Sequence, residues 1–175
     1  EIMWASMGIG NKILEVKILD PACGSGSFIT RAFSEVCGVV KDRLNRGEEG
    51  SKTLFKKPKR NLEELNLGQK IEILRSCIYG VDLDEKAIEL AKLNLLLKLL
   101  EGETQESRKM LLPHLESNIK CGNSLIDDSK VAGDKAFNWH AQFPDVFRNG
   151  GFDIVIGNPQ YILLQDKNRD EKILN

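Results

Sequence analysis

The sequence predicts an α/β fold, in which helices alternate with the strands of a parallel sheet. Apolar runs at residues 16–19 and 77–82 have the length and composition of buried strands, and an acidic residue closes each run. After each run, apolar residues recur every three or four positions, which is typical of a helix packed on a sheet. A glycine-rich turn at residues 20–28 joins the first strand to its helix. This order of strand, turn and helix is the pattern of βαβ units, whose strands run parallel.

The composition is that of one globular domain. The 175 residues are 41% hydrophobic and 29% charged, with a formal net charge of −1, and we expect a single domain over residues 1–175. No apolar run is as long as a membrane span, and the first residues lack the layout of a signal peptide, so we expect a cytoplasmic protein without membrane contacts. The four cysteines form no Cys-x-x-Cys pair. They therefore support neither a metal site nor a disulfide framework.

The turn after the first strand has the character of a ligand-binding site. Residues 20–28 read Asp-Pro-Ala-Cys-Gly-Ser-Gly-Ser-Phe. Gly24 and Gly26 allow the backbone to approach a ligand closely, and the following helix start offers unpaired N–H groups at a positive dipole end. Such a site suits an anion, either a phosphate or a carboxylate.

Three classes of cofactor use turns of this kind, and the spacing separates them. A nucleoside triphosphate loop ends in Gly-Lys-Ser/Thr, whereas Ser27 and Phe28 follow Gly26 here. A dinucleotide-binding turn has a third glycine where this chain has Ile29. This difference weakens the case for a dinucleotide without excluding it. S-adenosylmethionine is the alternative, because Asp20 can attract its ammonium group while the turn amides take its carboxylate. An ordinary tight turn without a ligand is the alternative that this motif alone leaves open.

Three helices are predicted before the second strand. The first starts at Ser27 and presents an apolar stripe to the sheet. After an exposed, charged loop at residues 47–60, a short helix is capped by Asn61 and ends at Gly68, and a third covers residues 69–75. The stripe on the first helix consists of Ile29, Ala32, Phe33, Val36, Val40 and Leu44.

The second half is predicted to continue the alternation. A helix covers residues 85–101, with Asp84 as its cap and Gly102 as its stop. Strands are predicted at residues 117–121 and 152–157, separated by a polar excursion that aromatic residues anchor onto the sheet. The predicted face of the helix contains Ala87, Leu90, Ala91 and Leu97, and the predicted anchors are Phe137, Trp139, Phe143 and Phe147.

Two segments resemble a known family. Residues 20–28 resemble motif I of the DNA amino-methyltransferases, above all the type II and IIG-like N6-adenine enzymes of bacterial restriction-modification systems. Residues 158–161 resemble their catalytic Asn-Pro-Pro-Tyr motif, with Gln160 in place of the second proline. The resemblance extends from Ile18 to Ile162. It implies a Rossmann-like, S-adenosylmethionine-dependent core with sheet order 3-2-1-4 and flanking helices, which methylates the N6 amine of adenine in DNA.

The resemblance also implies which residues bind S-adenosylmethionine. Asp82 would accept hydrogen bonds from the ribose hydroxyls, and Leu83 would lie beside the adenine ring. Asn123 would accept a hydrogen bond from the adenine amino group. The motif I residues of this cofactor site are Asp20, Ala22, Cys23, Gly24, Gly26 and Phe28.

The chemistry of methyl transfer explains the residues after the last strand. An exocyclic amine is a poor nucleophile because its lone pair is delocalised into the aromatic ring. The Asn158 side-chain oxygen and the Pro159 carbonyl would accept hydrogen bonds from its two N–H groups. They would thereby stabilise the positive charge that develops on the nitrogen during methyl transfer. Tyr161 would stack on an adenine rotated out of the duplex. Gln160 restores backbone freedom where the family has proline, which bears on turnover more than on cofactor binding.

Other functions remain open at this point. The chain can be a non-catalytic cofactor-binding or structural piece that is degenerate at Gln160, or it can methylate another planar amine such as cytosine N4, RNA or a protein glutamine. We expect a truncated catalytic core without target-recognition or nuclease domains. Because the net charge is −1, most contacts with double-stranded DNA are expected in domains outside this segment. Association through a bare sheet edge is also expected.

Overall fold

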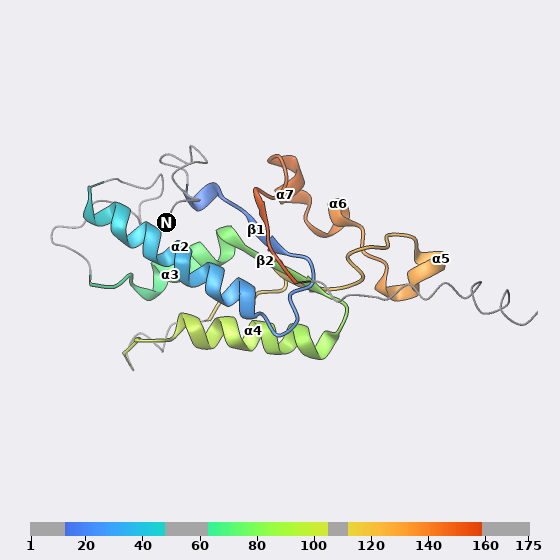
Figure 1. Ribbon diagram of the computed structural model, residues 1–175, viewed down its shortest axis with the longest axis horizontal. Helices are drawn as coiled ribbons and strands as arrows, with labels where there is room; N and C mark the ends of the chain where they lie inside the picture. Colours follow the sequence, from blue (N-terminus) through green and yellow to red (C-terminus); the bar gives the residue numbers. More distant parts are fainter. Residues whose placement is uncertain (1–12, 48–62, 105–111, 159–175) are drawn as a thin grey trace, which may run out of the picture.

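A four-stranded parallel sheet forms the centre of the molecule (Figure 1). The computed structural model describes residues 13–47, 63–104 and 112–158. The sheet order is β3-β2-β1-β4, and each pair of neighbours is parallel. The strands are β1 (Ile18–Asp20), β2 (Ile78–Asp82), β3 (Ile119–Cys121) and β4 (Ile154–Val155). The predicted α/β class and the strand order 3-2-1-4 are therefore confirmed, although β3 and β4 are shorter than predicted.

Helices cover both faces of this sheet. The three long helices are α2 (Ser27–Asn45), α3 (Leu67–Cys77) and α4 (Glu85–Leu99). The short ones are η1 (Ile13–Glu15), α5 (Ser129–Ala132), η4 (Gly133–Lys135), α6 (Trp139–Gln142) and α7 (Pro144–Arg148). No helix in the described part of the chain combines the length and the apolar character that crossing a membrane requires.

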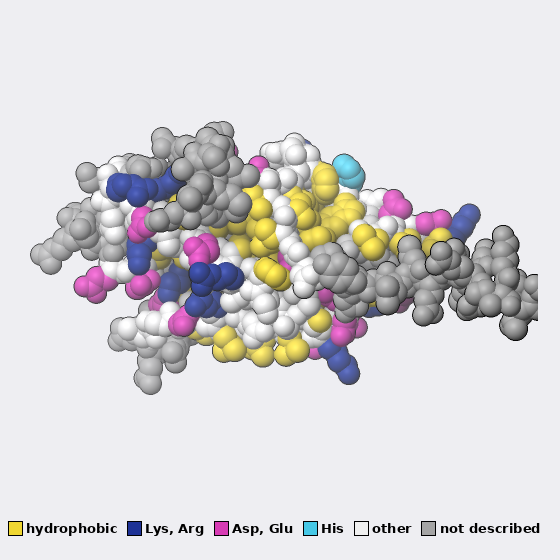
Figure 2. Space-filling view, in the orientation of Figure 1, with side chains coloured by type: hydrophobic (Ala, Val, Ile, Leu, Met, Phe, Trp, Pro, Cys, Tyr) yellow, Lys and Arg dark blue, Asp and Glu magenta, His cyan; other side chains and the backbone are white. Residues whose placement is uncertain are grey.

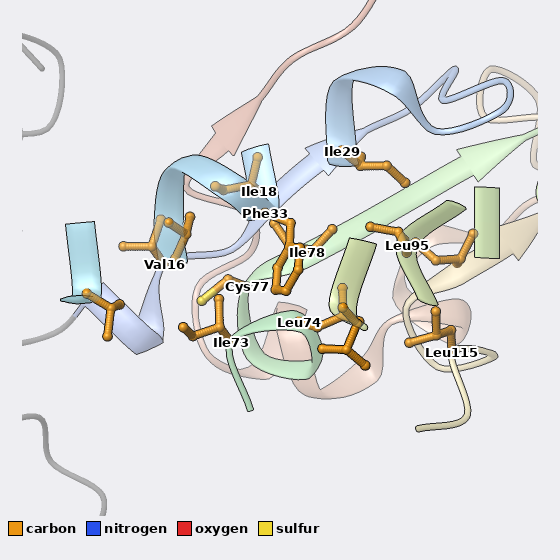
Figure 3. Packing of buried hydrophobic residues seen from close by; sticks show 14 of the residues in the cluster. Val16, Ile18, Ile29, Phe33, Ile73, Leu74, Cys77, Ile78, Leu95 and Leu115 are labelled. Atoms are coloured by element: carbon orange, nitrogen blue, oxygen red, sulfur yellow. The ribbon is translucent and has the colours of Figure 1, made fainter. Parts of the chain in front are cut away.

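The alternation of side chains along β1 and β2 divides the core into two. Ile18 and Ile78 pack with the three long helices, as the close view of the larger cluster shows (Figure 3). Leu19 and Tyr79 point to the opposite face, where α6 and α7 cover the sheet. Tyr79 there makes edge-on contacts with Phe143 and Phe152, at ring-centroid distances of 5.7 and 5.3 Å. All four predicted aromatic anchors belong to this second cluster, so their predicted packing role is confirmed.

The apolar stripe predicted for α2 is confirmed. Its residues Ile29, Phe33, Val36, Val40 and Leu44 are buried, and Ala32 packs beside them. The start of α3 differs from the prediction. Its cap is Asn66, whose side chain accepts a hydrogen bond from the Gln69 backbone N–H at 3.0 Å while the Gln69 side chain accepts from the Asn66 N–H.

Gly68 therefore lies in the first turn of α3, and the prediction that it ends a helix is wrong. The reciprocal Asn66 and Gln69 bonds satisfy two N–H groups at the helix start, so they determine where the helix begins. Asn61, the predicted cap, lies outside the described residues, and residues 63–66 are not helical.

The predicted face of α4 is partly wrong. Leu90 and Leu97 are 51% and 59% exposed, and hydrophobic side chains line the outer edge of α4 in the space-filling view (Figure 2). The buried residues are Ile88, Ala91, Leu95 and Leu99. Because leucines surround this helix, its sequence periodicity alone does not identify the side that packs on the sheet. The predicted cap is confirmed, since the Asp84 side chain accepts from the Lys86 N–H at 2.9 Å.

A buried ion pair connects α3 to the turn after α4. The Lys70 ammonium donates to Glu103 at 2.8 Å and to the Glu101 carbonyl at 3.1 Å, and the Lys70 and Glu103 side chains are only 11% and 9% exposed. Lys70→Ala is expected to lower the free energy of unfolding by about 1 to 3 kcal/mol, because it leaves a largely buried carboxylate without its partner. Urea unfolding measures this loss.

The matched control replaces both partners. Lys70→Met combined with Glu103→Leu should remain near the stability of the parent protein, since no buried charge is left. A single variant as stable as this double variant would contradict a role for the ion pair.

Candidate functional site

The carboxyl ends of the strands bring the predicted site residues to one edge of the sheet. Asp20 ends β1, Asp82 ends β2, and Asn123 and Asn158 follow β3 and β4 within three residues. In open parallel sheets, ligands bind at this edge. The candidate site is built there on the turn between β1 and α2.

Glycine is required at the end of that turn. Gly24 and Gly26 have φ values of 53° and 89°, which residues with a side chain rarely adopt. A Cβ added at Gly26 would lie 3.0 Å from the Cβ of Ala91, so the turn lies directly against α4. α2 then begins at Ser27, and its first hydrogen bond runs from the Thr30 N–H to the Gly26 carbonyl at 2.9 Å.

Asp20 carries a buried carboxylate with an unused acceptor. The residue has no exposed surface. Its Oδ1 accepts a hydrogen bond from the Ala22 N–H at 3.0 Å, whereas its Oδ2 is buried and has no hydrogen-bond partner among the described residues. Burial raises the pKa of Asp20, against the effect of the Ala22 N–H, and the nearby Asp82 charge raises it further. A cationic group bound here would satisfy Oδ2 and relieve the cost of the buried charge.

Asp82 organises the turn from the neighbouring strand. Its Oδ2 accepts from the Gly24 N–H at 2.7 Å, and its Oδ1 accepts from the Asp84 N–H at 2.9 Å. The Cys23 N–H donates to the Val81 carbonyl at 2.9 Å and adds a second connection. Each carboxylate oxygen can accept another hydrogen bond, so Asp82 can hold the turn and still bind a hydroxyl group.

The two glycine amides are already used within the protein. The Gly24 N–H donates to Asp82, and the Gly26 N–H donates to the Cys23 carbonyl at 2.8 Å. The expectation that these turn amides bind a carboxylate does not fit this geometry. The first turn of α2 is a better anion site, because N–H groups at a helix start have no partner within the helix.

The other predicted cofactor residues surround this turn. Phe28 and Leu83 are 50% and 54% exposed, so each offers apolar surface at the edge of the sheet. Asn123 donates from its backbone N–H to the Lys135 carbonyl at 2.7 Å, and its side-chain oxygen accepts from the Leu125 N–H at 3.1 Å. That oxygen has a second lone pair for a ligand amine.

Cys23 is a packing residue beneath the turn. It is 5% exposed, and burial, together with the charges of Asp20 and Asp82, raises the pKa of its thiol to about 12. The thiol is therefore protonated at neutral pH and is not a nucleophile. Ala22 is partly buried and supplies the N–H that fixes Asp20.

The end of β4 brings Asn158 next to the turn. The Ile156 N–H donates to the Leu19 carbonyl at 2.8 Å, which holds β4 beside β1 one residue before Asp20. Asn158 itself is exposed. Pro159, Gln160 and Tyr161 lie outside the described residues.

Sequence reasoning missed Gly157, which lies against Asp20. A single glycine after a strand is typical of any loop, so the sequence offered no signal that singled it out.

Two family models match the chain. The model of the Eco57I restriction-modification methylases matches residues 76–175, and the RMKL-like methyltransferase domain matches residues 12–120. Among curated proteins, the chain is similar to the type II restriction enzyme and methyltransferase RM.Eco57I of Escherichia coli, with 38% identity over 162 residues. This alignment covers 90% of the chain and 16% of the relative.

Two further relatives extend the comparison. The putative type II restriction enzyme and methyltransferase RM.MjaORFECS2P of Methanocaldococcus jannaschii is 36% identical over 64% of this chain and 9% of its own length. The adenine-specific methyltransferase PglX of Streptomyces coelicolor is 27% identical over 87% of this chain and 13% of its own length. The chain thus spans a small part of each of these relatives.

Proposed function

The chain belongs to the Eco57I restriction-modification methylase family, and from that membership we propose that it transfers a methyl group from S-adenosylmethionine to the N6 amine of adenine in DNA. The observation that carries the proposal is the buried Oδ2 of Asp20, which has no hydrogen-bond partner within residues 13–47, 63–104 and 112–158. This oxygen lies at the end of β1, next to the strand that leads to Asn158. A site for a cation thus adjoins the side chain that would receive the target amine.

The residues present fit S-adenosylmethionine. Asp20 would bind the ammonium group, and the first turn of α2 would bind the carboxylate. Asp82 would accept from the ribose hydroxyls while it continues to hold Gly24. Leu83 and Phe28 would contact the adenosine through their exposed apolar surfaces, and Asn123 would accept from the adenine amine. Ala22, Cys23, Gly24 and Gly26 would shape the turn rather than react.

In the methyl-transfer step, the protein would act through hydrogen bonds and stacking and would form no covalent bond with the substrate. When bound, S-adenosylmethionine supplies an electrophilic methyl group on a sulfonium sulfur. The Asn158 oxygen and the Pro159 carbonyl would accept hydrogen bonds from the two N–H groups of the target amine, hold its lone pair toward that methyl group, and stabilise the positive charge that develops on nitrogen. As the new N–C bond forms, the bond from the methyl group to sulfur would break, and one N–H proton would then pass to solvent. Tyr161 would stack on the flipped base. The protonated thiol of Cys23 takes no part.

The proposal of adenine in DNA as substrate has two supports. Asn158 and Tyr161 match the family's catalytic motif, and two relatives are named adenine-specific methyltransferases, PglX and BrxX. We further propose that the activity serves a restriction-modification system. Because the net charge is −1, most phosphate contacts would come from outside these 175 residues.

A methyl-transfer assay tests the proposal. The chain, or any longer protein that contains it, should transfer label from S-adenosylmethionine to duplex DNA, and the digested product should contain N6-methyladenine. The matched control is the same duplex with N6-methyladenine at every adenine, which should accept no label. Label in cytosine or in protein would contradict the proposed substrate, and cofactor binding without any transfer would favour a non-catalytic role.

A further inference from the structure

Gly157 lies in unusually close contact with Asp20. A Cβ added at Gly157 would lie 2.6 Å from Oδ1 of Asp20, 3.4 Å from its Cγ and 3.6 Å from Cδ of Pro21. The first distance is far below an ordinary contact between carbon and oxygen. Gly157 is not among the described glycines with positive φ. The backbone there can therefore accept alanine, and lack of space beside the carboxylate is what requires glycine.

Both sides of this contact are restrained. Asp20 has no exposed surface, its backbone pairs with Gly80 of β2, and the Ala22 N–H holds its Oδ1 at 3.0 Å. On the other side, the hydrogen bond from the Ile156 N–H to the Leu19 carbonyl holds the chain one residue before Gly157. A methyl group at residue 157 would therefore rotate the Asp20 carboxylate or displace the segment that carries Asn158.

We propose that Gly157 is a positioning residue, which keeps the cofactor-binding carboxylate of Asp20 and the catalytic side chain of Asn158 in register by letting the end of β4 lie directly against that carboxylate. The inference rests on the proposed function for its consequence in catalysis. The steric coupling of Gly157 to Asp20 is independent of that function.

A double-mutant cycle on stability tests the coupling without cofactor. Gly157→Ala should lower the melting temperature by roughly 3 to 10 °C when Asp20 is present, as expected for overpacking. In an Asp20→Ala background the same substitution should cost less than half as much, because the obstructing oxygen is gone. An equal loss in both backgrounds would overturn the inference. Gly38→Ala is the control without a clash, since nothing lies within 4 Å of a Cβ at Gly38. It should raise the melting temperature in both backgrounds, because Gly38 lies inside α2 and alanine favours the helix.

Binding and turnover then distinguish a positioning role from a purely structural one. At a temperature where every variant is folded, Gly157→Ala should weaken S-adenosylmethionine binding about 10-fold and lower turnover at saturating cofactor by a further 10-fold or more. Gly38→Ala should change neither value. Parent-like affinity and turnover in folded Gly157→Ala would overturn the positioning role. If the parent protein itself bound no cofactor, the proposed function would fail, and the stability cycle would report separately on the contact.

Discussion

Asp20→Asn is expected to weaken S-adenosylmethionine binding about 100-fold, because it removes the negative charge that would pair with the cofactor's ammonium group. Oδ2 of Asp20 is a buried carboxylate oxygen at the proposed site, and it has no hydrogen-bond partner among the described residues. Asparagine keeps the size of the side chain and can still accept from the Ala22 N–H, so the turn should keep its shape. Calorimetric titration measures the affinity.

The control for this comparison is Asp145→Asn on α7. Asp145 is exposed and pairs with Arg148 on the surface at 2.8 Å, so this variant should bind cofactor like the parent. An affinity of Asp20→Asn within threefold of the parent would show that Asp20 does not bind the ammonium group.

The same substitution is expected to stabilise the cofactor-free protein at neutral pH. Burial raises the pKa of Asp20 above its ordinary value of 3.8, so the folded state holds this proton to higher pH than the unfolded chain does. This tighter binding of the Asp20 proton stabilises the folded state. The contribution is fully present below pH 3.8 and is lost as the pH rises through the pKa of Asp20 in the folded protein. Above the folded pKa the parent carries a buried charge that asparagine avoids, and there the variant should be the more stable of the two.

Urea unfolding between pH 4 and 8 checks this pH dependence. The stability difference between the two proteins should grow as pH rises and then level off above the folded pKa of Asp20. A difference that stays constant over this range would mean that the Asp20 carboxylate does not change its protonation there. If Asp20→Asn bound S-adenosylmethionine more weakly and were also more stable than the parent, Asp20 would be a residue that serves cofactor binding and destabilises the fold.

Asn158→Ala should reduce turnover about 100- to 1000-fold and leave cofactor affinity within about twofold of the parent. The Asn158 oxygen would stabilise charge that develops on the target amine only during transfer, and removing one such group typically has an effect of this size. Single-turnover methyl transfer at saturating cofactor measures the loss, and calorimetry measures the affinity.

Asn149→Ala provides the comparison for this variant. Asn149 caps the end of α7, where its side-chain amide donates to the Asp145 carbonyl at 2.7 Å, and its loss should not change turnover. If Asn158→Ala lowered cofactor affinity and turnover equally, Asn158 would act through the cofactor site rather than on the amine.

Two carboxylates at neighbouring strand ends give this site its chemical character. Asp82 is satisfied by the N–H groups of Gly24 and Asp84, whereas Asp20 keeps an oxygen without a partner in the part of the chain described. The two residues therefore have different roles: Asp82 holds the turn in place, and Asp20 can bind a cation. A bound cation would also reduce the repulsion that each carboxylate exerts on the other.

The order of strand, glycine turn and helix was readable from local patterns alone. The apolar run before Asp20, the stripe on α2 and the cap at Asp84 each depend on residues within a few positions of one another, and all three are present. The face of α4 was not readable, because its leucines surround the helix and the buried side is selected by the tertiary packing of Ile88, Ala91, Leu95 and Leu99. The start of α3 was also not predicted. It depends on the reciprocal bonds of Asn66 and Gln69, whereas the sequence pattern predicted a helix cap at Asn61.

The sequence by itself therefore determined the fold class, through short-range periodicity, and the motif residues, through their spacing; the strand order followed from the family resemblance that those motifs carry. Only the tertiary structure decided how those residues interact. The bond from Gly24 to Asp82 spans 58 positions, and the contact of Gly157 with Asp20 joins two strands that are distant in sequence. Such contacts form because parallel strands bring their carboxyl ends to one edge, and no local pattern records which atoms then meet.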